Sequence, residues 1–171
     1  MSVTFTASIG ATEINVFSPD TDVFILLLRR YYELSTEVHF VTGTGQRHRV
    51  IKLRPIAQTL GRSRLAALPG LHAVSGADVT GSFANKGKLT WWKMFKDTNE
   101  ATIDALSKLG TRGLTTADTM AAIEKLVCRL YVPNTPIKTV SELRWSLVSW
   151  SGAAVRQVIA PPTGATAERR G

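Results

Sequence analysis

The sequence predicts an α/β sandwich with a C-terminal helical region. Strand-like segments occupy the first third of the chain, and helix-like segments fill the rest. An acidic turn, Ser18-Pro19-Asp20-Thr21-Asp22, joins the first buried strand to the first helix. Alternating or β-branched runs indicate strands, whereas apolar residues every three or four positions indicate helices. Strands that lead into helices in this way are typical of a mixed α/β sandwich.

Three strands and one helix are expected in the first part of the chain. Residues 14–18 form a β-branched and aromatic run that Pro19 ends, which is typical of a buried strand. Residues 23–33 have helical spacing. The preceding aspartates suit the N-terminus of a helix. Residues 37–42 and 47–53 alternate on either side of a glycine turn, which predicts a hairpin-like pair.

The later segments predict short helices separated by glycine and proline breaks. Gly61 divides the first two, and a short apolar piece follows them. The expected helical or apolar segments are 55–60, 63–68, 71–74, 89–96, 100–109, 116–130 and 140–150. We therefore expect a weakly structured N-terminus (1–13), one domain (14–150) and a disordered tail (151–171).

Composition limits the classes of protein to which the chain can belong. Its 171 residues suffice for one core, and 44% of them are hydrophobic, as in globular proteins. Lys and Arg number 21 against 13 Asp and Glu, and this net charge of +8 favours polyanionic partners. A single cysteine, Cys128, excludes an internal disulfide. No apolar run approaches the roughly 20 residues that span a bilayer, and no secretory signal is visible. We expect no membrane partner and an intracellular protein, nuclear or cytoplasmic.

The acidic turn is the first candidate site. Asp20 and Asp22 follow a predicted strand, at the sheet edge where open α/β folds bind their ligands. Two carboxylates at this spacing can converge on one hard divalent cation such as Mg²⁺. The alternative interpretation is that both residues cap and polarise the following helix.

A second candidate site combines an isolated acid with a basic turn. Asp78 lies in a glycine-bounded turn, and Asn85-Lys86-Gly87-Lys88-Leu89-Thr90 then opens a helix. Free backbone N–H groups at such a helix start, flanked by lysines, suit phosphate binding. Arg47 and Arg49 lie in a basic stretch of the hairpin, where we consider both nucleic-acid contact and a solvated surface.

Together, the segments 18–28 and 71–90 resemble PIN-like nucleases of the flap-endonuclease type, in a divergent eukaryotic branch linked to mobile elements. The resemblance implies a partial PIN-like three-layer sandwich with a short sheet and a helix-turn-helix-like region. It implies that Asp20, Asp22 and Asp78 are catalytic ligands of Mg²⁺ or Mn²⁺ in phosphodiester hydrolysis. It also implies contact with the DNA or RNA backbone, by Lys86, Gly87, Lys88 and Thr90.

The family pattern is incomplete in this sequence. Members of the family have an Asp after the first strand and a helical Glu pair upstream, but Glu13 is the sole acid before Asp20. We therefore expect metal binding to be weak or lost, because few anionic ligands remain to offset the repulsion between two ions. The missing front of the domain predicts an exposed sheet edge that a partner chain would cover. An inactive nucleic-acid-binding module and a protein-interaction remnant are the alternatives.

Overall fold

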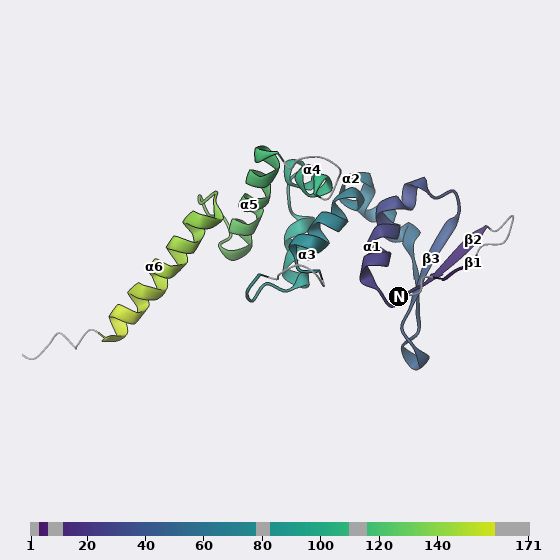
Figure 1. The fold of residues 1–171 in the computed structure, drawn as a ribbon, viewed down its shortest axis with the longest axis horizontal. Helices are drawn as coiled ribbons and strands as arrows, with labels where there is room; N and C mark the ends of the chain where they lie inside the picture. The colour runs from purple at the N-terminus through teal and green to yellow at the C-terminus, as the bar shows by residue number, and fades with distance from the viewer. Residues whose placement is uncertain (1–3, 7–11, 78–82, 110–115, 160–171) are drawn as a thin grey trace, which may run out of the picture.

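The structure is a computed structural model that describes residues 4–6, 12–77, 83–109 and 116–159. A small sheet lies at one end of an elongated molecule, and the helices continue from it to the other end (Figure 1). The mixed α/β class is confirmed. Among the described residues, no helix is both long enough and apolar enough to cross a membrane.

The sheet has four strands in the order β1-β2-β3-β4. Strand β2 (Glu13–Phe17) pairs in parallel with β3 (Glu37–Thr42), and helix α1 (Thr21–Arg30) connects the two. A 3-10 turn, η1 (Tyr31–Glu33), extends α1. Strand β4 (Arg49–Lys52) pairs antiparallel with β3 beyond a second such turn, η2 (Gly45–Arg47). These elements agree closely with the strands and helix that the sequence predicts.

The outer side of β2 carries a further strand, β1 (Thr4–Thr6), in antiparallel pairing. Its register places Thr4 opposite Phe17 and Thr6 opposite Asn15. We expected the N-terminal residues to be weakly structured and this edge of the sheet to be open. Three residues of the chain itself pair along it instead.

Helix α2 (Leu53–Val74) combines the three segments expected at 55–60, 63–68 and 71–74. The helix is kinked at Gly61, whose φ of 71° and ψ of 169° lie outside the helical region. Glycine adopts positive φ without the steric cost that a Cβ atom imposes, so the kink requires this residue. Pro69 also lies within the helix.

The helical region contains four further helices. They are α3 (Lys88–Lys96), α4 (Glu100–Lys108), α5 (Ala117–Tyr131) and α6 (Val140–Ile159). A three-residue turn at 97–99 joins α3 to α4, which is the connectivity of a helix-turn-helix. Helix α6 continues to Ile159, beyond the boundary at residue 150 where we placed the start of the disordered tail.

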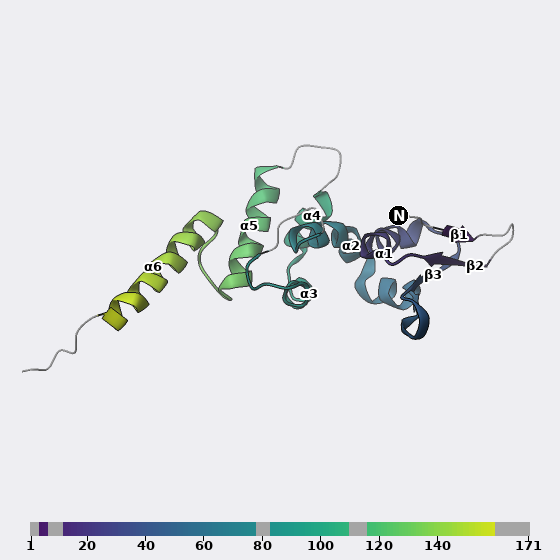
Figure 2. The same cartoon turned by 60° about the horizontal axis from the view of Figure 1, so that its bottom comes forward.

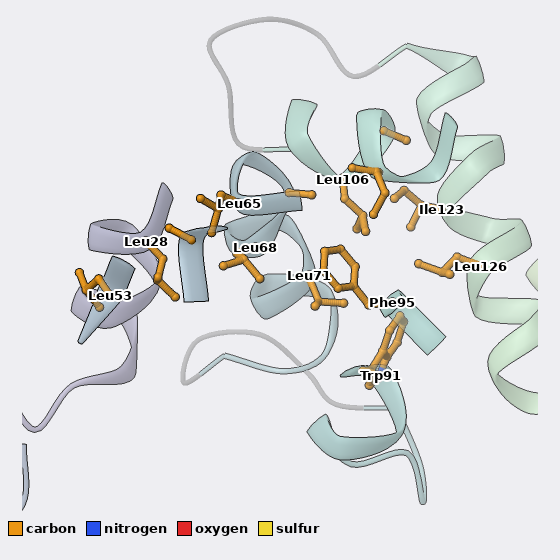
Figure 3. Close-up of a cluster of buried hydrophobic side chains, with 14 of the residues drawn as sticks. Leu28, Leu53, Leu65, Leu68, Leu71, Trp91, Phe95, Leu106, Ile123 and Leu126 are labelled. Atoms are coloured by element: carbon orange, nitrogen blue, oxygen red, sulfur yellow. The ribbon is translucent and has the colours of Figure 1, made fainter. Parts of the chain in front are cut away.

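Buried apolar side chains extend from the sheet to α5 (Figure 3). Leu28 and Leu53 lie at the sheet end, Leu71 lies in the middle, and Leu106 and Ile123 lie at the α4–α5 end. At the sheet end, the rings of Phe24 on α1 and Phe40 on β3 are 5.1 Å apart.

Helices α2 and α4 approach each other closely at Gly70. A methyl group on Gly70 would lie 2.1 Å from the carbonyl oxygen of Leu106, which is closer than atoms can pack. The absence of a side chain at Gly70 therefore sets the separation of the two helices.

Candidate functional site

Asp20 is the N-cap of α1. Its Oδ1 atom accepts a hydrogen bond of 2.8 Å from the backbone N–H of Asp22, and its φ and ψ of −91° and 124° are extended. Its own N–H donates to the hydroxyl of Ser18 at 3.1 Å. This is the capping role that we considered as the alternative to metal binding, and it occupies one carboxylate oxygen.

Asp22 contacts a histidine from a distant part of the chain. Its Oδ1 atom lies 2.6 Å from Nε2 of His72 in the last turn of α2. The His72 side chain is 13% exposed and the Asp22 side chain is 54% exposed, so the pair lies at the rim of the protein. Asp22 and His72 line a cavity of about 230 Å³ together with Ala77.

The predicted ligand set Asp20, Asp22 and Asp78 is only partly within the described residues, because Asp78 is outside them. Among the residues that the structure describes, no three His, Cys, Asp or Glu side chains gather closely enough to hold a metal ion. Asp20 and Asp22 are adjacent at the start of α1, but each already has a hydrogen-bonding partner. The three-aspartate site therefore stays a prediction.

The basic turn before α3 is ordered by its own contacts. The N–H of Lys86 donates to the carbonyl of Phe83 at 3.0 Å, and Asn85 has a positive φ of 59°. The Lys86 ammonium lies 5.1 Å from the centre of the Tyr131 ring, whose hydroxyl donates to the carbonyl of Ala84. Lys86 is therefore half-buried and engaged with an aromatic face, which leaves it less available to a phosphate than we predicted.

The start of α3 is open and positively charged. Gly87 is the N-cap and has no side-chain hydrogen bond to offer, while Lys88 and Thr90 are exposed. The first N–H groups of a helix lack intrahelical acceptors and carry the positive end of its dipole. A methyl group on Gly87 would meet no atom within 4 Å, so the space beside the N-cap is open.

Sequence reasoning missed two further lysines on α3. Lys93 and Lys96 are exposed, whereas Trp91 and Phe95 are buried on the other side of the helix. Neither lysine forms an ion pair with a described residue. We call Lys88, Lys93 and Lys96 the α3 basic patch. The signal for Lys93 and Lys96 was present in the sequence, because lysines three apart on a helix lie on one side of it. These two lie in the last turn of α3, and Lys88 lies in its first.

The hairpin between β3 and β4 is a second basic surface. Arg47 and Arg49 are both exposed, and neither forms an ion pair within the described part of the chain. By contrast, Arg54 is paired with Glu37, whose hydrogen bond and charge raise the pKa of Arg54 above its ordinary value. Figure 2 shows the hairpin and α3 toward the lower side of the molecule.

No protein-family model, no curated protein and no solved structure matches this chain. The geometry of the site is therefore the basis for a functional proposal, and the resemblance to PIN-like nucleases stays a prediction.

Proposed function

We propose that the chain is a nucleic-acid-binding module that holds the phosphate backbone through the start of α3 and the α3 basic patch. The observation that carries this proposal is the open N-terminus of α3. It combines uncapped N–H groups, an unobstructed Gly87 and an exposed Lys88.

The chemistry of this surface suits phosphate and does not depend on base sequence. Helix N–H groups and lysine ammonium groups both donate hydrogen bonds to phosphate oxygens, and the helix dipole favours an anion at the same end. Lys93 and Lys96 extend the positive charge along the helix toward its C-terminus. Such contacts supply affinity and orientation, whereas base edges would have to be read by other groups.

The β3–β4 hairpin supplies a second, smaller part of the proposed surface. Arg47 and Arg49 are free to meet a phosphate, and the net charge of +8 attracts a polyanion from a distance. Arg49 also lies on an edge strand, where a positive side chain discourages pairing with another sheet. The proposal therefore rests on α3 first and on the hairpin second.

Salt-dependent binding tests the proposal. Affinity for labelled single-stranded and duplex DNA and RNA would be measured by fluorescence anisotropy at several salt concentrations. The slope of log affinity against log salt is expected to fall by about 1 for each phosphate contact removed, as in the double variant Lys93→Gln/Lys96→Gln. Lys138→Gln is the matched control, because Lys138 is exposed in the connection between α5 and α6. Equal weakening by the control, or binding without salt dependence, would overturn the proposal.

Gly87→Ala tests the backbone contact separately. The added methyl group meets open space, so folding is expected to be unchanged. It would nevertheless occupy the open space beside the start of α3, where the proposed phosphate binds, and binding should weaken several-fold in every sequence context. Unchanged affinity would remove the α3 start from the binding surface.

Metal-dependent phosphodiester hydrolysis is a second candidate function. One observation favours it: Ala77, the residue before Asp78, lines the same cavity as Asp22, which follows the Asp20 cap. Asp20→Asn is the informative variant, because asparagine caps a helix as well as aspartate does while it removes the charge that a cation requires. Cleavage with Mg²⁺ or Mn²⁺ that Asp20→Asn abolishes would support hydrolysis. Absence of cleavage by the unaltered chain would leave backbone binding alone.

A further inference from the structure

A small cavity of about 180 Å³ lies where α1, α2 and α3 meet. Leu68 and Leu71 of α2 and Trp91 of α3 form part of its wall (Figure 3). Thr21 at the start of α1 and Lys88 at the start of α3 also line it. We call it the Trp91 cavity.

Trp91 brings an unused hydrogen-bond donor to this cavity. Only 1% of the residue is exposed, and its Nε1 atom has no hydrogen-bond partner among the described residues. The indole N–H can only donate. Buried donors nearly always have an acceptor, because an unpaired donor loses its bonds to water without replacement. An acceptor atom of a ligand in the cavity would supply the missing partner.

The other polar groups around the cavity favour an anion. Lys88 carries a positive charge, can only donate, and forms no ion pair with a described residue. The Nε2 atom of His72 is already directed at Asp22, 2.6 Å away. The Ser75 hydroxyl donates to the carbonyl of His72 at 3.2 Å, so it is satisfied without a ligand. No described residue that lines the cavity is acidic, so the charge of Lys88 favours an anionic head.

The rest of the wall is apolar. Ile25 comes from α1, Leu68 and Leu71 come from α2, and Trp92 comes from α3. Moving a bare inorganic anion from water into such surroundings is unfavourable, whereas an apolar group gains from the same contact. The cavity is also smaller than the roughly 300–1,000 Å³ of a pocket for a drug-sized ligand. The occupant that fits is therefore a small molecule with one acidic head and an apolar body.

We propose that the Trp91 cavity binds a small organic anion. A carboxylate or phosphate head accepts hydrogen bonds from the Trp91 N–H and the Lys88 ammonium, and the apolar body packs on Ile25 and Leu71. The site goes beyond the proposed function, because Trp91, Ile25 and Leu71 take no part in the phosphate-backbone surface. Lys88 belongs to both sites. If the proposed function holds, a bound anion therefore neutralises part of the α3 basic patch and weakens nucleic-acid binding.

Titration of the full chain with small probes tests the site, followed by the indole N–H signals of its four tryptophans in ¹⁵N NMR spectra. Benzoate and phenyl phosphate are the anionic probes, inorganic phosphate lacks the apolar body, and benzyl alcohol lacks the charge. At least one anionic probe should shift the Trp91 signal with saturation, and it should bind at least about tenfold more tightly than the two partial probes. The tighter anionic probe identifies the head group. An unmoved Trp91 signal, or a partial probe that binds equally well, would overturn the proposal.

Two variants assign the contacts. Trp91→Phe removes the N–H but keeps an aromatic ring, and its missing signal identifies Trp91 in the spectra. Lys88→Gln removes the charge at an exposed position, where folding should be unaffected. Each variant should weaken binding of the tighter probe by at least about tenfold in calorimetry, whereas the matched control Lys138→Gln should not. Undiminished binding by Lys88→Gln, which decides the question even if Trp91→Phe fails to fold, or equal weakening by the control would overturn the proposal.

The same measurements separate this site from the phosphate-backbone surface. Trp91→Phe should leave the salt-dependent affinity for nucleic acid unchanged, because the buried indole is out of reach of a phosphate backbone. A chain that binds nucleic acid but none of the probes would overturn the cavity site alone. A chain that binds the probes but no nucleic acid would overturn only the proposed function.

Discussion

The Nε2 atom of His72 lies 2.6 Å from Oδ1 of Asp22, which joins the last turn of α2 to the first turn of α1. Fifty positions separate the two residues in the sequence. The pair gives the Asp22 carboxylate a partner within the protein, so a cation at the acidic turn would have to share this carboxylate with His72 or displace it. Asp20 has a different role at the same helix end, where it caps α1.

Replacement of Asp20 should separate capping from charge. Asp20→Ala removes the acceptor for the N–H of Asp22 and is expected to lower the free energy of unfolding by about 1 kcal/mol. Asp20→Asn retains an acceptor and should leave the free energy of unfolding nearly unchanged. Urea titration followed by circular dichroism measures both. An equal loss in the two variants would show that the negative charge, and not the cap, supplies the stability.

Gly70→Ala should destabilise the crossing of α2 and α4. The added methyl group would lie 2.1 Å from the Leu106 carbonyl oxygen, so one helix must move. Overpacking of this kind costs about 1–3 kcal/mol. Gly87→Ala is the matched control, since its methyl group meets nothing within 4 Å. Thermal unfolding of the two variants compares them directly, and similar melting temperatures would contradict the prediction.

Thr98→Val should be neutral or stabilising by up to about 1 kcal/mol. Thr98 is 5% exposed, and its hydroxyl has no hydrogen-bond partner among the described residues. Replacing an unsatisfied buried hydroxyl with a methyl group of the same shape removes its desolvation penalty. The contrasting change is Thr102→Val. Its hydroxyl donates to Asn99 at 2.8 Å, and its loss should cost about 1 kcal/mol. Denaturant midpoints that rank the two variants in the opposite order would refute this reasoning.

Cys128 should react slowly with thiol reagents in the folded protein. It is fully buried on α5, and burial, followed by the charges of Glu124 and Glu142, raises the pKa of its thiol above the ordinary value. Because only the thiolate reacts, modification by a disulfide reagent near pH 8 should be slow and should accelerate on unfolding.

The raised pKa of Cys128 also sets the sign of a pH effect. The unfolded chain loses the thiol proton at a lower pH than the folded chain does. Stability is therefore fully present below the ordinary thiol pKa, about 8.5, and declines as the pH rises through it toward the folded-state value. Cys128→Ala should flatten this decline in urea titrations at successive pH values. An unchanged slope would assign the decline to other groups.

Most of the fold follows from local patterns in the sequence. The alternation in residues 37–42 predicted β3 with its observed bounds, and Gly61 was placed correctly as the break between two helical segments. Strand β1 was missed because three residues carry no measurable periodicity, and their role depends on pairing with Phe17 and its neighbours. The extent of α6 was underestimated because small and polar residues weaken its pattern beyond residue 150.

The candidate site was less predictable than the fold. The sequence showed two aspartates at a strand-to-helix turn, but not that Asp20 caps the helix while Asp22 meets His72. Partners that are distant along the chain are decided by tertiary packing, which periodicity does not report. Lys93 and Lys96 were visible, yet a lysine on an exposed helix face is usually only solvated. They lie in the last turn of α3, so their significance depends on a phosphate backbone that runs along the helix from its open start.

The kinked helix α2 belongs to both parts of the molecule. Before Gly61, Leu53 and Ala57 are fully buried at the sheet end, and after it Leu65 and Leu68 are buried among the helices. Neither the sheet end nor the helical region therefore has a complete hydrophobic core of its own. If one half of α2 unfolds, the apolar side chains that pack beside the other half become exposed. The sheet and the helices should therefore unfold as one cooperative unit. A fragment cut on either side of this helix would be left with an unfinished core, and an engineered version of this protein must keep α2 whole.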